Sequence, residues 1–426
     1  MKVLIITYYW VPSGGSGVQR WLKFVKYLRD FDIEPLVYTV DNANYPIIDR
    51  SLEKDVPNDI EVLKKNIWEP NDVLSRLKKK STKTSAGFLN PNPTFFGKIM
   101  QYIRANYFIP DARKYWVKPS VKKIKSYLKE NHIDVIITTG PPHSLHLIGL
   151  QLKKELNIKW VADFRDPWTD IDYFHQLPLT KTSKRRHFKL EKEVLKKADA
   201  SLVIGKTMKK NYEDYSKNIH VVTNGYDTEF DGIKEVNLDK KLSITHIGLM
   251  NSDRNPKILW EALSELSEEI KGFRNNLEIK LIGKLANEVI EELKKKDFKN
   301  ITRIDYVAHN EVKKHQRNSQ VLLLAINKVP SAKGIITGKI FEYLQAKRPI
   351  LAIGPEDGDL AEILEKTNAG FIINFDDKNK MKRVIKNMYN KYKDGNLEVS
   401  SKEIEQYHRK ELTKQLSEIL KEVVSS

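Results

Sequence analysis

Short runs of apolar and β-branched residues recur along the chain, and each is followed by a stretch with the apolar spacing of a helix. The runs are continuously apolar rather than alternating, which is typical of strands buried on both faces of a parallel sheet. Strands that alternate with helices of ten or more residues predict βαβ units and an α/β fold. The predicted strands are residues 3–9, 35–40, 135–139, 160–164, 201–205 and 220–223, then 242–248, 278–283, 321–326, 349–354 and 370–374.

The series of strands starts afresh after a polar stretch at residues 224–241. This restart predicts two doubly wound, Rossmann-like domains, and 426 residues also exceed the size of one ordinary core. An aromatic and basic stretch at about 66–118 breaks the strand–helix pattern and is expected to be an insertion in the first domain. The domains are expected at 1–232 and 233–400, followed by a helix within 401–426 that packs back across the linker.

The composition is that of a globular protein from a reducing compartment. Hydrophobic residues make up 40% of the chain, and cysteine is absent, which excludes disulfides and thiolate zinc sites. No window of about 18 residues is uncharged and apolar throughout, and the first residues suit a buried strand better than a secretory signal. These features predict a cytoplasmic protein without a membrane-spanning helix.

The net charge of +18 is unevenly distributed. Between Arg76 and Lys129 there are 14 basic residues, nine aromatic residues and a single acid, Asp111. A basic field of this kind attracts nucleic acid, acidic lipid or phosphorylated substrates. The alternative is a lysine-rich face that is simply solvated.

A glycine-rich loop follows the first predicted strand and precedes a helix. Gly15 and Gly17 let the backbone approach a ligand closely, and the helix N-terminus offers free N–H groups to an anion. The dinucleotide fingerprint requires a third glycine, but Arg20 occupies that position, so a nicotinamide cofactor is not expected. Both a loop shaped for phosphate or sugar and a plain tight turn remain open.

Polar residues also follow two other strands of the first half. His143 lies in a loop directly after one strand and can project into a cleft, whereas His146 lies between leucines and is expected to be packed. Asp163, Arg165 and Asp166 follow another strand directly. Charges at such a position need partners, either each other or a ligand. The two acids lack the neighbouring ligands that a metal site would need.

In the second half, Arg254 lies just ahead of a predicted helix start, where a guanidinium can hold phosphate oxygens. Lys339 and Glu342 lie three residues apart on another helix, so they share a face about 4.5 Å apart along its axis. Gly338 leaves room for a diphosphate beside the first amides and the ammonium, while the carboxylate can accept hydrogen bonds from ribose hydroxyls. This is no ATPase loop, because Ile340 stands where a serine or threonine is required. The alternative is a surface ion pair.

These residues resemble a GT-B glycosyltransferase of the large family four, in the subgroup of bacterial polysaccharide synthesis. The most specific segment is GKIFEYLQAKRPILAIGPEDGDLAEIL, residues 338–364, and the glycine loop near residue 15 and the string at 224–227 also fit. The resemblance implies two Rossmann-like domains that face a central cleft, with the acceptor bound by the first and a nucleotide-sugar by the second. It also implies that the C-terminal helix returns to the first domain.

The resemblance also implies how the donor is held. Lys339 and Arg254 would contact the diphosphate and Glu342 the ribose, with neither a metal nor another cofactor required, because basic groups and helix N-termini neutralise the leaving diphosphate. Two positions depart from the family pattern. Gly334 replaces the first glutamate of its Glu-x7-Glu motif, and Leu249 replaces a basic residue of the second domain's first loop.

The expected reaction is transfer of a hexose-type sugar with retention, in which the departing diphosphate helps to deprotonate the incoming hydroxyl. The candidate catalytic residues are His143, Asp163 and Asp166; the candidate substrate-binding residues are Gly15, Gly17, Arg165, Arg254, Gly338, Lys339 and Glu342.

The expected partners are a nucleotide-sugar, a glycan or lipid-linked acceptor of cell-surface polysaccharide synthesis, and an anionic inner-membrane surface touched by residues 76–129. Two rival functions remain. One is a nucleotide-sugar epimerase of the same fold, and the other is a basic nucleic-acid-binding protein, although no reading motif for nucleic acid is present, so nucleic acid is not an expected partner.

Overall fold

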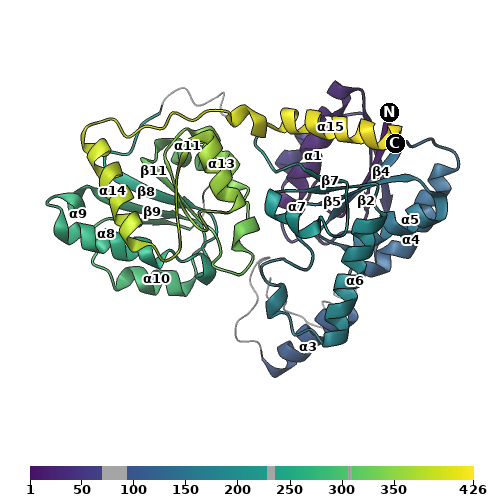
Figure 1. Cartoon of the computed structure of the whole chain (residues 1–426), viewed down its shortest axis with the longest axis horizontal. Helices are drawn as coiled ribbons and strands as arrows, with labels where there is room; N and C mark the ends of the chain where they lie inside the picture. The colour runs from purple at the N-terminus through teal and green to yellow at the C-terminus, as the bar shows by residue number, and fades with distance from the viewer. Residues whose placement is uncertain (70–93, 228–235, 306, 308) are drawn as a thin grey trace. The chain divides into compact units, whose positions relative to one another are not determined.

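The computed structural model describes residues 1–69, 94–227, 236–305, 307 and 309–426, and it divides into two compact units (Figure 1). Unit 1 comprises residues 1–224 and 409–426, and unit 2 comprises residues 225–408. Unit 1 ends before the expected residue 232 because the chain already pairs within unit 2 there. The backbone N–H of Tyr226 donates to the carbonyl of Tyr407 at 3.0 Å.

The described part of unit 1 contains a parallel sheet of seven strands in the order β3-β2-β1-β4-β5-β6-β7. Consecutive residues of β1 alternate between two cores, so that Leu4 and Ile6 face one layer of helices while Val3 and Ile5 face the other. The strands are β1 (Lys2–Ile6), β2 (Glu34–Val40), β3 (Glu61–Lys65), β4 (Val135–Gly140), β5 (Lys159–Phe164), β6 (Ala200–Val203) and β7 (Ile219–Val221).

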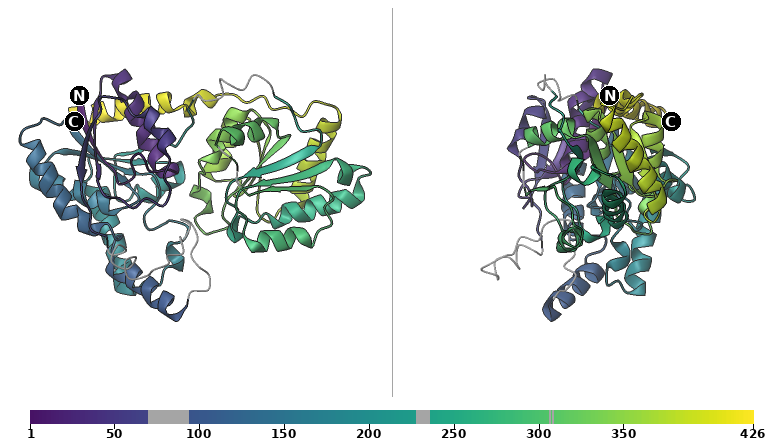
Figure 2. Two further views of the ribbon diagram at one scale, coloured as in Figure 1. Left: turned by 180° about the vertical axis from the view of Figure 1, so that it is seen from behind. Right: turned by 90° about the vertical axis from the view of Figure 1, so that its left-hand side faces the viewer.

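Helices cover both faces of this sheet (Figures 1 and 2). One face packs against α1 (Ser16–Leu28) and α15 (Arg409–Ser425), and these two helices also contact each other. The last helix therefore returns to the first unit, as expected. The other helices of unit 1 are α3 (Phe95–Tyr107), α4 (Lys114–Leu128), α5 (Ser144–Leu156), α6 (Lys181–Lys197) and α7 (Lys206–Tyr212).

The described part of unit 2 contains a second parallel sheet, of six strands in the order β10-β9-β8-β11-β12-β13. The strands are β8 (Leu242–Ile247), β9 (Leu277–Ile282), β10 (Ile301–Ile304), β11 (Val321–Ala325), β12 (Ile350–Ile353) and β13 (Gly370–Ile373). The helices are α8 (Lys257–Glu269), α9 (Phe273–Asn276), α10 (Asn287–Lys294), α11 (His309–Asn318), α12 (Lys339–Ala346), α13 (Asp359–Thr367) and α14 (Lys378–Lys393). Two parallel sheets with alternating helices confirm the α/β prediction.

The hydrophobic pattern missed two strands, β3 and β10, and both lie at the edge of their sheets. Their sequences, EVLKK and ITRI, contain charged residues and are only half-buried. Edge strands are covered on fewer sides than central ones, so they lack the continuous apolar run on which the prediction rested.

The predicted insertion at 66–118 is only partly a separate feature. Residues 70–93 lie outside the described residues. From Lys114 onward the chain forms α4, which packs on α5 as a regular layer of the fold and buries Trp116, Val121 and Ile124. What remains of the insertion among the described residues is α3 and its flanks. No helix in the described ranges is long and apolar enough to span a bilayer.

Candidate functional site

The strand order of each unit creates a point where neighbouring loops diverge. In unit 2, β8 connects toward β9 and β11 connects toward β12, so the loops after β8 and β11 part at their carboxyl ends. Such a switch point is the usual ligand site of an open α/β sheet. Gly248 follows β8, Asn327 follows β11, and the next α-helix after β11 is α12, which begins at Lys339.

Lys339, the first residue of α12, lies directly over Gly248. A Cβ atom on Gly248 would stand 2.5 Å from the Lys339 Nζ and 2.7 Å from its Cε. Gly248 also has a φ of +114°, which residues with a side chain rarely adopt. A glycine is thus required at position 248 for two reasons: its backbone has a positive φ, and the Lys339 side chain occupies the space of a Cβ atom.

Positive charge converges around Lys339. Burial, and then the neighbouring Arg254 guanidinium, lower the pKa of Lys339 to about 8, with Glu342 opposing the shift. Within the described chain, no carboxylate makes an ion pair with the Lys339 ammonium. The same two cations, after burial, help to lower the pKa of buried His246 to about 3, so this imidazole is neutral. Two close cations and a neutral histidine favour a bound anion.

Arg254 is held at the same place by side chains. Its Nε donates to Asn327 Oδ1 at 2.6 Å, and its backbone N–H donates to Asn251 Oδ1 at 3.0 Å. It ends a short 3₁₀ turn, Ser252–Arg254, just ahead of α8. The sequence-based expectation that this arginine lies beside a helix start and near Lys339 therefore agrees with the structure.

Glu342 lies one turn further along α12 and is exposed. The amide of Gln316, a buried residue of α11, donates to Glu342 Oε2 at 3.1 Å and orients the carboxylate. Gly338 caps the helix without a side-chain hydrogen bond, and a Cβ there would meet no atom within 4 Å. A ligand can therefore approach the first turn of α12, with the carboxylate available to hydroxyl donors.

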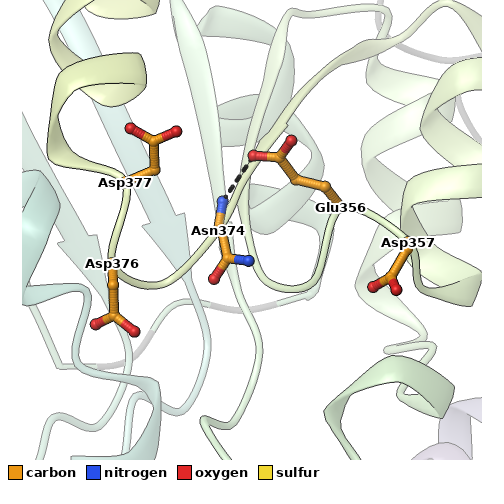
Figure 3. A pocket seen from close by; sticks show the side chains of 5 residues that line it. All are labelled: Glu356, Asp357, Asn374, Asp376 and Asp377. Carbon is orange, nitrogen blue, oxygen red and sulfur yellow. Dashed lines mark hydrogen bonds between the residues drawn. The ribbon is translucent and has the colours of Figure 1, made fainter.

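A hollow of about 620 Å³ opens beside the ends of β12 and β13, and Lys339 is not among its lining residues (Figure 3). Its acids are already paired: Glu356 accepts from the Asn374 backbone N–H at 3.1 Å and from Lys380 at 2.6 Å, and Asp376 accepts from Lys328 at 2.6 Å. The described residues contain no cluster of three or more groups arranged for a metal ion. An acidic hollow repels phosphate, so we do not place the diphosphate here. Its lining residues are Glu356, Asp357, Asn374, Asp376 and Asp377.

In unit 1 the switch point lies between β1 and β4. Gly15 caps α1 with a φ of +88°, and a Cβ there would point into open space. Gly17 is different, because a Cβ on it would stand 2.9 Å from Arg165 NH1. Arg165 donates from NH1 to the Gly17 carbonyl and from NH2 to the Pro141 carbonyl, so it joins the loops after β1 and β4. Gly17 and Arg165 therefore contact each other and hold the loops together, whereas Gly15 remains open to a ligand.

Asp163 is wholly buried, and its carboxylate is fully engaged. Its oxygens accept hydrogen bonds from Arg20 NH2 at 2.9 Å and from Trp21 Nε1 at 2.7 Å. The Thr139 hydroxyl adds a third at 2.9 Å. Arg20 in turn donates to the Val222 carbonyl at 2.8 Å. This geometry assigns Asp163 to the support of the loops and does not favour the catalytic role expected from the sequence.

His143 lies at the start of α5 and stacks on Trp168, with the ring centroids 5.0 Å apart and the planes 6° from parallel. Burial, aided by His146 and Arg165, holds its pKa well below the ordinary value, so the ring is neutral. Asp111 fixes the start of this helix, since it accepts from the Ser144 N–H at 2.9 Å and the Ser144 hydroxyl at 2.8 Å. The ring can line a site but is not charged near neutral pH.

Asp166 is half-buried and retains the character of an acid–base group. Burial raises its pKa to about 6, and Asp172 and Asp163 add to the rise while Arg165 opposes it. A carboxyl that titrates near neutral pH at the end of a strand is a candidate for proton transfer or for orienting a hydroxyl.

The sequence reasoning missed the residues that hold the candidates in place. Gln316 acts on the α12 site, and Arg20, Asp111 and Trp168 act on the loops of unit 1. Gly248 was expected at a strand end, but its contact with Lys339 was not. Arg20 and Asp163 are 143 positions apart, so no local spacing connects them. A usable signal did exist for Asp111, the single acid within a long basic stretch.

Comparison with known proteins identifies the class. Residues 89–230 match the family model Glycosyltransferase Family 4. Three solved structures align over nearly the whole chain. The apo lipopolysaccharide outer core galactosyltransferase WaaB has a TM-score of 0.60 at 12% identity and covers 99% of both chains. HepE from Anabaena, solved with UDP-glucose, has 0.57 at 13% identity and covers 100% of this chain and 98% of its own.

The third structure is described as a putative UDP-N-acetylglucosamine 2-epimerase from Listeria monocytogenes. Its TM-score is 0.53 at 12% identity, and it covers 97% of this chain and 94% of its own. No curated protein matches the sequence.

Because these solved structures are only 12–13% identical in sequence, their similarity to this chain shows a shared fold and no more. The chain has the fold of the GT-B glycosyltransferases, and its residues 89–230 match the glycosyltransferase family 4 model. The family resemblance and the enzyme class, glycosyltransferase, are thereby confirmed.

Proposed function

We propose that this glycosyltransferase transfers a sugar from a nucleotide-sugar donor to a glycan or lipid-linked acceptor of cell-surface polysaccharide synthesis. The observation that carries the proposal is the α12 site, where the Lys339 ammonium lies beside the Arg254 guanidinium and itself makes no ion pair with a carboxylate of the described residues. A diphosphate would supply the missing negative charge, and Glu342 one turn away would accept hydrogen bonds from the ribose.

The reaction is proposed to need no metal, because the two cations and the uncapped start of α12 can stabilise charge on the leaving diphosphate. Retention of configuration is proposed with the diphosphate assisting deprotonation of the acceptor hydroxyl. In unit 1, neutral His143 and half-buried Asp166 would line and orient the reacting groups, with Arg165 holding the loops that carry them. Gly15 leaves backbone exposed to the acceptor.

Thermal-shift screening against UDP, GDP, dTDP and their sugars tests the donor assignment, with the Lys339→Met variant as control. We expect one nucleoside diphosphate to stabilise the protein and this effect to disappear in the variant. UDP-glucose is the first ligand to test, since HepE was solved with it. Equal stabilisation of both proteins would refute the assignment of Lys339.

The epimerase alternative is favoured by one observation, the similarity to the Listeria structure. Incubation of the enzyme with the donor alone, followed by nuclear magnetic resonance of the sugar, separates the two reactions. An epimerase would convert the donor without an acceptor, whereas the proposed transferase leaves its configuration unchanged.

A further inference from the structure

Two basic elements of unit 1 that are distant in sequence form one surface. The side chain of Asn106, near the end of α3, donates to the Pro178 carbonyl at 2.8 Å and accepts from the Thr180 N–H at 2.8 Å. These bonds fix α3 against the start of α6, and Figure 1 shows the two helices side by side. We call α3 together with residues 181–190 of α6 the basic–aromatic surface.

The apolar side chains of α3 are not used by the core. None of its residues is buried; Phe95 is 81% exposed, Ile99 41% and Tyr102 44%. Their spacing of four and three residues places them on one face of the helix. Phe188 of α6 adds another aromatic ring that is 44% exposed. Large apolar side chains gathered in this way mark a contact surface.

The charge of the same surface has one sign. Residues 95–107 and 181–190 together contain seven lysines and arginines and no acid. The crowding of cations reaches Lys114, whose pKa is lowered by burial and by Arg186. Exposed Phe, Tyr and Ile flanked by Lys and Arg are the pattern of a helix that lies in the headgroup region of an anionic bilayer.

The structure describes residues 94–129 of the docking segment expected from the sequence. That segment, residues 76–129, included α4, but the apolar residues of α4 face the core, including Trp116, Val121 and Ile124. The exposed ring of α4 is Tyr115, in its first turn, at 44%, and the lysines of the later turns lie beyond it without a further exposed aromatic side chain on this helix. Residues 181–190 of α6, outside the expected segment, supply most of the charge instead.

We propose that the basic–aromatic surface docks the enzyme on the anionic face of a lipid bilayer. This deepens the proposed function and rests on it, since an enzyme that acts on a lipid-linked acceptor must reach a membrane surface. The rings of α3 enter the headgroup region, while the cations of α3 and α6 contact anionic lipid headgroups.

The test is cosedimentation of the full chain with vesicles of neutral lipid alone or with added anionic phosphatidylglycerol. Three double variants are compared with the natural sequence, and all substituted side chains are exposed or on exposed faces, so folding should persist. They are Phe95→Ser/Tyr102→Ser on α3, Lys184→Gln/Arg185→Gln on α6, and the charge-matched control Arg383→Gln/Lys386→Gln on α14.

Binding is expected only to anionic vesicles and should fall with added salt. Loss of the two α6 charges should weaken it about thirtyfold, at about 1 kcal/mol per charge near the surface. Loss of the two rings should weaken it by more than about tenfold. The α14 control should bind as the natural protein does.

Three outcomes would overturn the proposal: no preference for anionic vesicles, an equal loss in the α14 control, or a change of oligomeric state in the α3 variant that accounts for the loss. Salt-sensitive binding of the same surface to duplex DNA more tightly than to vesicles would also overturn it. Nucleotide thermal shifts are measured on every variant. They remain normal if only docking fails, so this failure is distinct from a failure of the donor site.

Discussion

Replacement of Gly248 by alanine tests the α12 site without removing any charge. The new Cβ would stand 2.5 Å from Lys339 Nζ, whereas ordinary contacts of a Cβ begin near 3.4 Å. The ammonium must therefore move by roughly 1 Å, which lengthens a hydrogen bond of about 2.9 Å to about 3.9 Å and breaks it. A hydrogen bond to a charged group contributes about 1.5–3 kcal/mol, so nucleoside diphosphate affinity should fall about 10- to 150-fold.

Isothermal titration calorimetry with the nucleoside diphosphate found in the thermal screen measures this loss. An alanine at the positive φ of Gly248 also strains the backbone and should lower the free energy of unfolding by about 1–3 kcal/mol. The control variant must therefore place an alanine at a positive φ as well. Gly395→Ala is such a control, since Gly395 has a φ of +69° and open space at its Cβ. We expect both variants to lose stability and only Gly248→Ala to lose affinity. Unchanged affinity in Gly248→Ala would refute the placement of the diphosphate beside Lys339.

Three further predictions follow from the charged groups. Because the pKa of Lys339 is lowered to about 8, its ammonium loses its charge as the pH rises through 8, and diphosphate affinity should decline over the same range. The contribution of Lys339 to stability should instead increase between pH 8 and the ordinary lysine pKa near 10.5, since the unfolded chain binds more protons than the folded one there. Calorimetry at several pH values checks the first sign and urea titration checks the second. Asp163→Ala leaves the buried Arg20 cation uncompensated and should lower the free energy of unfolding by about 3–5 kcal/mol in urea titration; a loss below about 1 kcal/mol would contradict the structural role. Asp166→Asn should remove the limb near pH 6 from the kcat/KM profile, and persistence of that limb in the variant would assign it to another group.

The α/β fold and the position of Lys339 and Glu342 on one helix could be anticipated because their signals are local. Buried parallel strands are continuously apolar, and Lys339 and Glu342 are one helical turn apart, so both follow from spacing along the chain. The edge strands β3 and β10 were not predicted, because they are partly exposed and contain charged residues that interrupt the apolar pattern.

The roles of the unit 1 residues could not be anticipated because they depend on distant partners. The charges of Asp163 and Arg165 at a strand end correctly indicated that partners were required. Those partners, Arg20 and the carbonyl of Gly17, are more than a hundred positions away in sequence. Spacing along the chain does not reveal which acid is already neutralised by a partner in the fold. Asp163 is neutralised in this way by Arg20, whereas the pKa of Asp166 is raised by burial.

The most direct test of the donor site is a crystal structure of the protein with its nucleoside diphosphate. We expect a phosphate oxygen within about 2.7–3.2 Å of Lys339 Nζ and the ribose hydroxyls within hydrogen-bond distance of the Glu342 carboxylate. A diphosphate bound elsewhere, for example on the Gly15 loop of unit 1 with Lys339 unliganded, would contradict it.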